Sequence, residues 1–182
     1  AAAHFKKAWG GKVWEKGFRL TLCYNTGNDV RESFAGMLKR SVESLNPRFH
    51  VDVRGVQWST YLDQMDQHAL PVFLMGWQGG VDTHDYALPF MDSQGLFPLS
   101  QGYSDPQADA LVARAVRERD PRRRAALYRR LEDRADDEAW LVPVSDLSNA
   151  RVERTWVKGF VFRPAFVDMP YGSDYYDLYK AE

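Results

Sequence analysis

The stretch Phe18-Arg19-Leu20-Thr21-Leu22-Cys23-Tyr24 alternates apolar with polar residues and is rich in strand-forming side chains, so it predicts a β-strand. Turn-forming residues follow at 25–28. A helix is expected over 29–45, because its apolar residues recur at helical spacing and Asn46-Pro47 ends the pattern. A strand followed by an amphipathic helix is typical of an α/β fold.

The alternation of strand and helix continues downstream. Residues 49–56 alternate apolar and polar side chains and predict a second strand, and a short helix is expected from Ser59 to about His68. The apolar run 71–75 predicts a central strand that is buried on both faces. Such an order favours parallel strands joined by right-handed crossovers. In a sheet of that kind, ligands bind at the edge where the carboxyl ends of the strands meet.

The sequence after residue 100 predicts mainly helices. One is expected to begin at Ser104-Asp105-Pro106 and another at Asp120-Pro121, because both stretches combine a capping residue with an early proline. Further strands are predicted at 139–144 and 160–162. Acidic residues follow the arginines of the second helix, which predicts a solvated, charge-paired face rather than a phosphate-binding one. These arginines are residues 122, 123, 124, 129 and 130.

The composition excludes several classes of protein. The 182 residues are 45% hydrophobic and 14% aromatic, enough for a core, and the net charge of −1 lacks the basic surplus that nucleic-acid binding needs. No apolar run approaches the roughly eighteen residues that span a bilayer, and the first residues lack the apolar region of a signal peptide. The single Cys23 rules out an internal disulfide. We therefore expect a globular domain with no nucleic-acid partner.

Sequence motifs for catalysis, metals and cofactors are lacking. The four histidines are scattered without paired metal-ligand spacing, and there is neither a phosphate-binding loop nor a nucleophile elbow. The carboxylates form no spacing-defined acid–base pair. The sequence therefore predicts no catalytic residue, no metal and no cofactor, and it favours a binding protein over an enzyme.

The segment 74–86, Leu-Met-Gly-Trp-Gln-Gly-Gly-Val-Asp-Thr-His-Asp-Tyr, is the candidate ligand-binding segment. Its apolar run ends in a tryptophan, two glycines and two acids, a combination that can expose the backbone, stack on a ligand and pair with a cation. The alternative is an ordinary turn with Trp77 in the core. Because the segment follows a predicted strand, we expect it to share one concave sheet edge with residues 25–29 and Trp58.

Arg31 lies near a helix start on the same predicted edge. A helix N-terminus favours anions, so Arg31 is a candidate anchor for a ligand carboxylate, and an exposed, solvated arginine is the alternative. The full set of predicted ligand-binding residues is Trp77, Gln78, Gly79, Gly80, Asp82, Trp58 and Arg31.

A series of short motifs runs through nearly the whole chain. They are a glycine–phenylalanine entry to a strand, an amphipathic helix, a valine–tryptophan–tyrosine segment, a glycine–tryptophan pair and a pair of helices followed by apolar segments. The residues are 16–22, 29–45, 56–61, Gly76-Trp77 with Asp82, 89–95, Asp120-Pro121, 126–128, 140–144 and 157–160. In this order, the motifs resemble the C-terminal lobe region of the peptide-class extracellular solute-binding proteins of ABC importers.

The resemblance implies an α/β fold, one lobe of a type II-like periplasmic binding protein, with a mixed sheet flanked by helices. It implies a ligand-binding lobe over 1–150, followed by a return segment and aromatic tail over 151–182. In that family a peptide lies in a cleft between two lobes. The implied partners are a small peptide, the missing N-terminal lobe of the same protein and the membrane permease of the importer. The implied location is periplasmic or extracellular, and membrane-associated.

The chain departs from the family at one motif. The glycine–tryptophan pair is usually followed by Ala-Asp-Tyr, and an aspartate near this motif pairs with the peptide's α-amino group. Here Gly79 or Gly80 takes the place of that aspartate, and Asp82 is the remaining candidate for the amine. The alternatives are a dipeptide, another cationic group, or a non-peptide solute such as a nickel chelate or an oligosaccharide. An α/β enzyme domain is a less favoured alternative. One lobe leaves a peptide exposed to water, so we expect the chain alone to bind peptides weakly or not at all.

Overall fold

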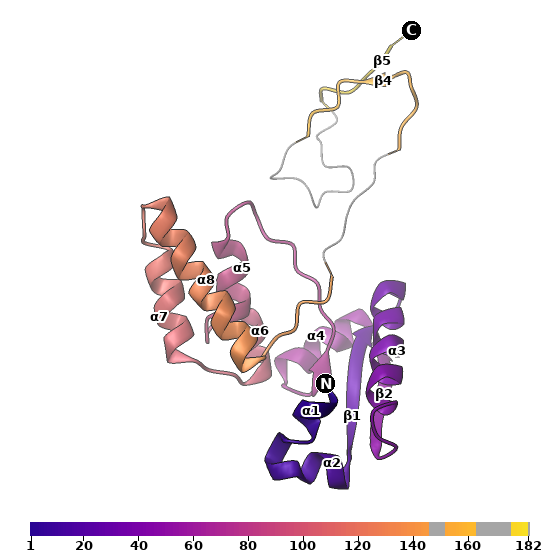
Figure 1. The fold of residues 1–182 in the computed structure, drawn as a ribbon. Helices are drawn as coiled ribbons and strands as arrows, with labels where there is room; N and C mark the ends of the chain where they lie inside the picture. Colours follow the sequence, from indigo (N-terminus) through magenta and orange to yellow (C-terminus); the bar gives the residue numbers. More distant parts are fainter. Residues whose placement is uncertain (146–151, 163–175, 182) are drawn as a thin grey trace. The chain divides into compact units, whose positions relative to one another are not determined.

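A computed structural model of the chain describes residues 1–145, 152–162 and 176–181. The chain divides into two compact units, Ala1–Gly76 with Ser100–Gly102, and Trp77–Leu99 with Tyr103–Glu182. Figure 1 shows the elements of both units, coloured along the sequence. Each unit buries a cluster of apolar side chains of its own.

The first unit contains a parallel sheet with helices around it. Its elements are α1 (Ala2–Phe5), η1 (Ala8–Gly11), α2 (Lys12–Lys16), β1 (Phe18–Asn25), α3 (Asp29–Glu43), β2 (Phe49–Val56), α4 (Trp58–Asp66) and β3 (Val72–Phe73). The three strands have the order β2-β1-β3. β1 pairs in parallel with β2, from Phe18 opposite Phe49 to Asn25 opposite Val56, and it pairs in parallel with β3. The predicted α/β fold with parallel strands is therefore confirmed.

The central strand of this sheet is β1, and not the predicted strand at 71–75. β3 has only two residues, is half-buried and lies at the edge of the sheet that the structure describes. In β1, by contrast, Leu22, Cys23 and Tyr24 are buried in succession. The prediction is wrong because a short apolar run indicates burial but does not indicate how many strands lie beside it.

Helices cover both faces of the sheet (Figure 1). Leu22 of β1 and Val72 of β3 pack in one cluster with the buried Ala35 of α3. Because side chains alternate along a strand, Phe73 points to the opposite face. There the ring of Tyr61, from α4, packs edge-on against Phe73 with ring centroids 6.5 Å apart. The sheet is thus enclosed between α3 and α4, and its strand ends are fixed from both sides.

Polar side chains define where α3 and α4 begin. Asn28 caps α3, because its Oδ1 accepts a hydrogen bond of 3.0 Å from the backbone N–H of Arg31. α4 begins at Trp58, one residue before the predicted Ser59, because the side chain of Gln57 accepts from the backbone of the first turn. Arg31 and Trp58 therefore both lie in the first turn of a helix that directly follows a strand.

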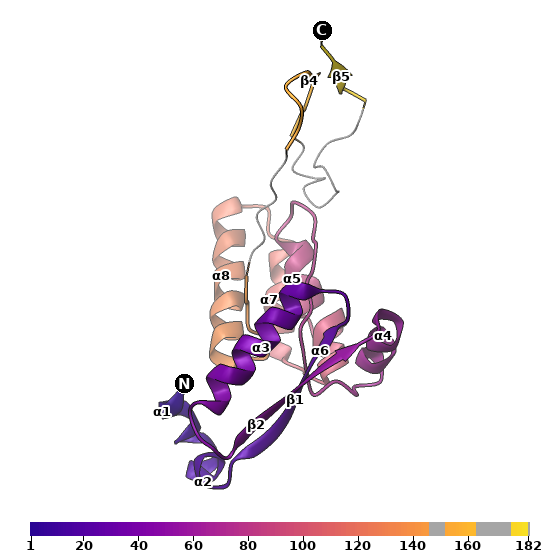
Figure 2. The same cartoon turned by 90° about the vertical axis from the view of Figure 1, so that its right-hand side faces the viewer.

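The remaining elements are mostly helices. They are α5 (His84–Met91), α6 (Leu96–Gln101), α7 (Pro106–Ala115), α8 (Pro121–Glu138), β4 (Val157–Lys158) and β5 (Tyr179–Lys180). α7 and α8 lie side by side in Figures 1 and 2, and with α5 they bury a shared cluster that includes Leu111 and Leu131. Asp105 and Asp120 cap α7 and α8 at their predicted starts. The predicted helix pair is confirmed.

The predicted strands at 139–144 and 160–162 are not formed. Among the residues that the structure describes, the strand near them is β4, which pairs antiparallel with β5. A strand needs a neighbour for its backbone hydrogen bonds, and residues 139–144 have none among the described residues. Trp140 instead stacks on Tyr103 at 4.7 Å and donates from Nε1 to the carbonyl oxygen of Phe90. Trp140 therefore packs within irregular chain, whereas Val142 and Val144 of the same run are exposed.

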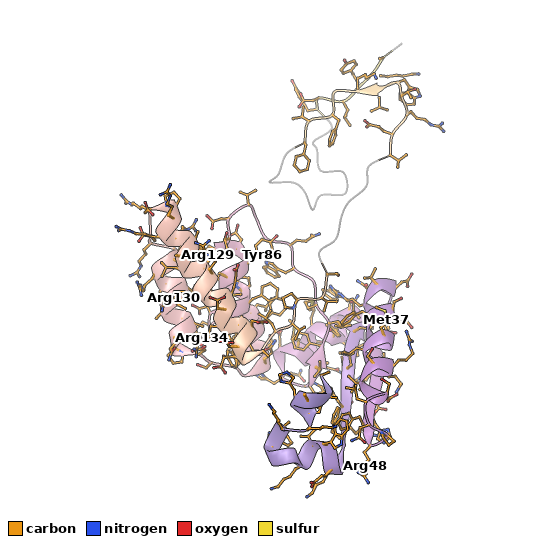
Figure 3. All side chains as sticks on the ribbon, in the orientation of Figure 1. Met37, Arg48, Tyr86, Arg129, Arg130 and Arg134 are labelled. Carbon is orange, nitrogen blue, oxygen red and sulfur yellow. The ribbon has the colours of Figure 1, made fainter. Side chains whose placement is uncertain are left out.

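Most arginines of α8 are solvated as predicted, but they are not paired, and the predicted solvation is wrong for Arg124, whose side chain is only 29% exposed. Within the described ranges, the ion pairs of α8 are limited to Arg124 with Asp82 and Arg134 with Asp105 and Glu138. Figure 3 shows Arg129 and Arg130 projecting from the helix. The predicted charge pairing is wrong for the first turns because the acidic residues come later in the helix, beyond the reach of its first arginines.

Two predictions fall partly outside the described residues. The division into 1–150 and 151–182 stays a prediction, because residues 146–151 are not described. The same holds for most of the aromatic tail, of which only residues 176–181 are described. In the described part of the chain, no helix combines the length and the apolar character needed to cross a membrane. That part also contains no cluster of three or more metal-ligating side chains.

Candidate ligand-binding site

The first unit brings two of the predicted residues to one edge of its sheet. β1 ends at Asn25, β2 ends at Val56 and β3 ends at Phe73, and parallel strands place these ends together. Arg31 follows the first of these ends and Trp58 follows the second. The edge is therefore formed as the strand–helix alternation predicts, with a cation and an aromatic ring on it.

The Arg31 guanidinium is half-buried beside the chain that leaves β3. Its Nη1 donates to Oδ1 of Asn25, and its Nη2 lies so close to Gly76 that a Cβ there would be 2.9 Å away. Burial lowers the pKa of Arg31, although the nearby Tyr61 acts in the opposite direction. No carboxylate of the residues that the structure describes forms an ion pair with this guanidinium. Its charge is thus uncompensated within the described chain.

Trp58 has one face packed and part of its surface in solvent. Its ring stacks on Tyr61 with centroids 6.1 Å apart and planes 15° apart, and 44% of the residue is exposed. Tyr61 itself is fully buried, and its hydroxyl donates to the carbonyl oxygen of Leu74 at 2.8 Å. The tryptophan is therefore held in place by a rigid neighbour while it remains accessible to a ligand.

The second unit contains the other predicted residues, in the segment before α5. The Trp77 indole donates from Nε1 to the carbonyl oxygen of Asp85 at 3.0 Å, and its ring meets Phe90 and Phe97 edge-on. Trp77 remains 40% exposed, and Gln78 beside it is exposed as well. Trp77 thus combines the two predicted alternatives, because it anchors the segment and still presents surface to solvent.

The two glycines allow side chains of the same segment to approach their backbone. A Cβ on Gly79 would lie 2.7 Å from the ring of Tyr86. A Cβ on Gly80 would overlap the carboxylate of Asp85. Tyr86 and Asp85 therefore occupy the space that side chains at these two positions would fill, and the ligand-facing role of the glycine backbone stays a prediction.

Asp82 forms the strongest polar contact of the segment. Its two carboxylate oxygens accept from Nη1 and Nη2 of Arg124 at 2.9 and 2.7 Å, and Oδ1 also accepts from the backbone N–H of His84. The hydrogen bonds from Arg124 above all lower the pKa of Asp82 to about 2. Arg124 also donates to the hydroxyl of Tyr128. The pair forms one wall of a depression of about 510 Å³.

Sequence reasoning missed Arg124 and Tyr61. Arg124 lies 42 residues from Asp82 in the sequence, inside a run of arginines that gives no sign of which one turns inward. The role of Tyr61 depends on contacts between α4 and the strands. Arg31 and Trp58 belong to one unit, and Trp77, Gln78, Gly79, Gly80 and Asp82 belong to the other. A single concave surface formed by both groups stays a prediction.

Comparison with curated proteins gives clear relatives. The chain is 28% identical over 153 residues to the periplasmic oligopeptide-binding protein OppA of Escherichia coli. The matched region covers 84% of this chain and 28% of that protein. The chain is 26% identical over 149 residues to the periplasmic murein peptide-binding protein MppA of the same organism, covering 80% of this chain and 27% of that protein. The chain thus spans only about 28% of the length of these relatives. No family model matches it.

Solved structures give the same result for the fold. The structure of OppA from Burkholderia pseudomallei matches 91% of this chain and 31% of its own chain, with a TM-score of 0.73 and 23% identity. Haemophilus influenzae OppA, in complex with the peptide RPPGFSPFR, matches with the same coverage and TM-score at 21% identity. The resemblance is therefore confirmed: the chain is homologous to a segment of the periplasmic oligopeptide-binding proteins and has their fold over that segment.

Proposed function

We propose that these 182 residues act as the C-terminal part of a peptide-capturing solute receptor of an ABC importer. The observation that carries the proposal is the match over 84% of the chain to an oligopeptide-binding protein. The relatives are named as binding proteins rather than enzymes, in agreement with the absence of catalytic motifs from the sequence. By the same relationship, the receptor works in the periplasm and delivers its ligand to a membrane permease.

The geometry of the first unit suits one end of a peptide. Arg31 is a half-buried guanidinium whose only described side-chain partner is an amide, so it can form charge-assisted hydrogen bonds with a ligand carboxylate. Trp58 offers an apolar surface beside it for a side chain or for the peptide backbone. We therefore assign the carboxylate end of the ligand to the binding residues of the first unit.

The chain alone is expected to bind peptides weakly. Its candidate groups are partly exposed, with Trp58 at 44% and Trp77 at 40%. An exposed ion pair contributes about 0–1 kcal/mol, and each main-chain hydrogen bond that a second lobe would donate adds about 0.5–1.5 kcal/mol. The loss of several such bonds moves a micromolar dissociation constant to about 1 mM or above.

Titration of the ¹⁵N-labelled chain with short peptides tests the proposal by NMR, which measures weak binding directly. We expect dialanine to shift the signals of Arg31 and of the Trp58 and Trp77 indoles, with a dissociation constant of about 1 mM or above. A nickel chelate and an oligosaccharide serve as competitors for the alternative ligand classes. Saturable shifts with either of these and none with peptides would contradict a peptide receptor.

A further inference from the structure

Arginines gather at the turn between α7 and α8 and along the exposed side of α8. The stretch from 117 to 130 holds seven arginines against two acids, whereas the whole protein has a net charge of −1. One of the seven, Arg124, turns inward and pairs with Asp82. The others are exposed, and we call them the arginine patch: Arg117, Arg119, Arg122, Arg123, Arg129 and Arg130.

The patch residues of α8 lie on the side of the helix that faces away from its core. Arg122 and Arg129 are seven residues apart, as are Arg123 and Arg130, so the members of each pair lie nearly in line along the helix, about 10 Å apart. Figure 3 shows Arg129 and Arg130 projecting from the helix. The guanidinium groups are therefore presented together to solvent from one regular helix. The buried residues of α8 occupy its other side and are Leu127, Tyr128, Leu131 and Ala135.

The acids near the patch do not pair with it. Glu118 Oε1 accepts from the backbone N–H of Asp120 at 2.9 Å, and Asp120 Oδ1 accepts from the backbone N–H of Arg123 at 2.8 Å. None of the patch guanidinium groups forms an ion pair with a residue that the structure describes. The sequence argued against a phosphate-binding face because it predicted charge pairing. Since that pairing is absent from the described part of the chain, the argument no longer holds.

The stability of α8 does not explain where these charges lie. Positive charges near the N-terminus of a helix oppose its macrodipole, and the first turn of α8 has no acidic residue to offset them. The other acids of α8 lie at 132–138, nearer its C-terminus. The patch therefore contributes little to the fold of this unit, and its charge is available to a partner.

The surroundings of the patch suit a charged bilayer better than a protein. Protein interfaces are centred on aromatic or apolar anchors that fill pockets. Within 106–138, all of which the structure describes, Val116 is the one large apolar side chain that is exposed. Clusters of about four to eight basic residues bind anionic membrane surfaces through their charge, without a fitted pocket. An acidic protein would meet charge at this patch but almost no apolar anchor.

We propose that the arginine patch binds the anionic headgroups of phospholipids at a membrane surface. Its guanidinium groups donate charge-assisted hydrogen bonds to phosphate oxygens, and their charges act together on the surface. The inference goes beyond the proposed peptide-receptor function and does not depend on it, because the patch contains none of the predicted ligand-binding residues. In a receptor, the patch would hold the protein close to the bilayer in which its permease lies.

Co-sedimentation of the whole chain with lipid vesicles tests the inference. Vesicles of phosphatidylcholine mixed with an equal amount of phosphatidylglycerol supply the anionic surface, and vesicles of phosphatidylcholine alone supply the neutral one. We expect the chain to sediment with the anionic vesicles only, and added salt to release it, because salt screens exposed charges. Equal binding to both kinds of vesicle, or binding to neither, would overturn the inference.

The double variant Arg122→Gln with Arg129→Gln removes two charges from the patch. Its partition onto anionic vesicles should fall by about ten- to thirtyfold, because each basic residue near such a surface contributes about a factor of five. Arg40→Gln with Lys12→Gln is the matched control, since it lowers the net charge equally at exposed positions outside the patch and should bind nearly as the wild type does. An equal loss in both double variants would show that net charge acts rather than the patch, and would overturn the inference. Circular dichroism checks that both variants keep the fold.

Two further measurements distinguish a charged membrane from other anionic partners. Arg122→Lys with Arg129→Lys keeps the charges and should keep vesicle binding, whereas a loss would indicate a fitted guanidinium site for a single phosphate group and would overturn the membrane assignment. Polyglutamate serves as the model of an acidic protein. If the chain binds polyglutamate through the patch but does not bind anionic vesicles, the partner is a protein and the inference is overturned.

Discussion

Arg31 in the first unit and Asp82 in the second are charged side chains with opposite surroundings. Arg31 is half-buried and bonds the amide of Asn25, and burial lowers its pKa. Asp82 has a side chain that is 45% exposed, yet both of its oxygens are paired with Arg124 and its pKa falls to about 2. One charge is buried without a counter-charge, and the other is accessible but already neutralised.

The difference separates binding groups from structural ones. A half-buried charge without an opposite charge weakens folding, so the carboxylate that we propose Arg31 binds would also stabilise this part of the chain. An exposed carboxylate with a bidentate guanidinium contributes to the fold and offers less to a ligand. Charge alone therefore does not identify a binding residue, and the burial and the partners of the charge must be considered with it.

The largest expected effect is that of Arg31 on peptide affinity. In a receptor-length protein that contains this chain, Arg31→Gln should weaken peptide binding by about ten- to a hundredfold, the size of a charge-assisted hydrogen bond of about 1.5–3 kcal/mol. The same substitution should leave the free energy of unfolding unchanged or raise it, because a half-buried charge is removed. Calorimetric titration and urea denaturation measure the two effects.

Arg40→Gln is the matched control for this experiment. Arg40 lies on the same helix and is exposed, so its replacement should leave the peptide affinity unchanged. If Arg31→Gln binds peptide within twofold of the wild type, Arg31 is not the anchor of the carboxylate. A marked loss of stability would show that Arg31 has a structural role, like Asp82.

The next effect concerns Tyr61, which fixes the surroundings of Arg31. Tyr61→Phe removes the hydrogen bond to the carbonyl oxygen of Leu74 and leaves that group unsatisfied at the end of β3, so the free energy of unfolding should fall by about 0.5–1.5 kcal/mol. Tyr86→Phe, at an exposed tyrosine, should have little effect and is the control. Equal stabilities of the two variants in urea denaturation would refute a structural role for the Tyr61 hydroxyl.

Local patterns in the sequence predicted the parts of the fold that depend on neighbouring residues. The strands at 18–24 and 49–56 were expected within one residue of their observed ends, since alternation and turn residues bound them. The positions of Arg31 and Trp58 at the sheet edge follow from the same alternation of strands and helices. Residues 139–144 show the limit, because an apolar run becomes a strand only if another strand lies beside it.

The candidate site was harder to predict because its electrostatics depend on distant residues. The pairing of Asp82 with Arg124 joins a loop to a helix 42 residues away. Without that contact, Asp82 resembles a free carboxylate. The residue types were visible in the sequence, but their partners were not.

The structural role of Asp82 has a consequence at low pH. Its pKa in the folded chain, about 2, lies below the ordinary value of 3.8, so the stabilisation by Arg124 is complete above about pH 4 and is lost as the pH falls toward 2. The wild type should therefore lose more stability than Asp82→Asn over this range. Because the carboxylate is substantially exposed, the difference should be small. Urea denaturation of both proteins between pH 5 and pH 2 measures it, and parallel pH profiles would show that the pair contributes nothing.

The smallest expected effect concerns charges that are both exposed and unpaired. The first turn of α8 contains no acidic residue and its last turn no basic one, the reverse of what the helix macrodipole favours. Arg122 lies in that first turn, exposed to solvent and outside the ion pairs of the described residues. Arg122→Glu should therefore raise the free energy of unfolding by about 0.3–1 kcal/mol, and the gain should shrink with added salt.

Arg129→Glu, near the middle of the same helix, is the control for a change of net charge alone. If both variants shift the urea midpoint equally, the net charge and not the helix dipole determines the effect.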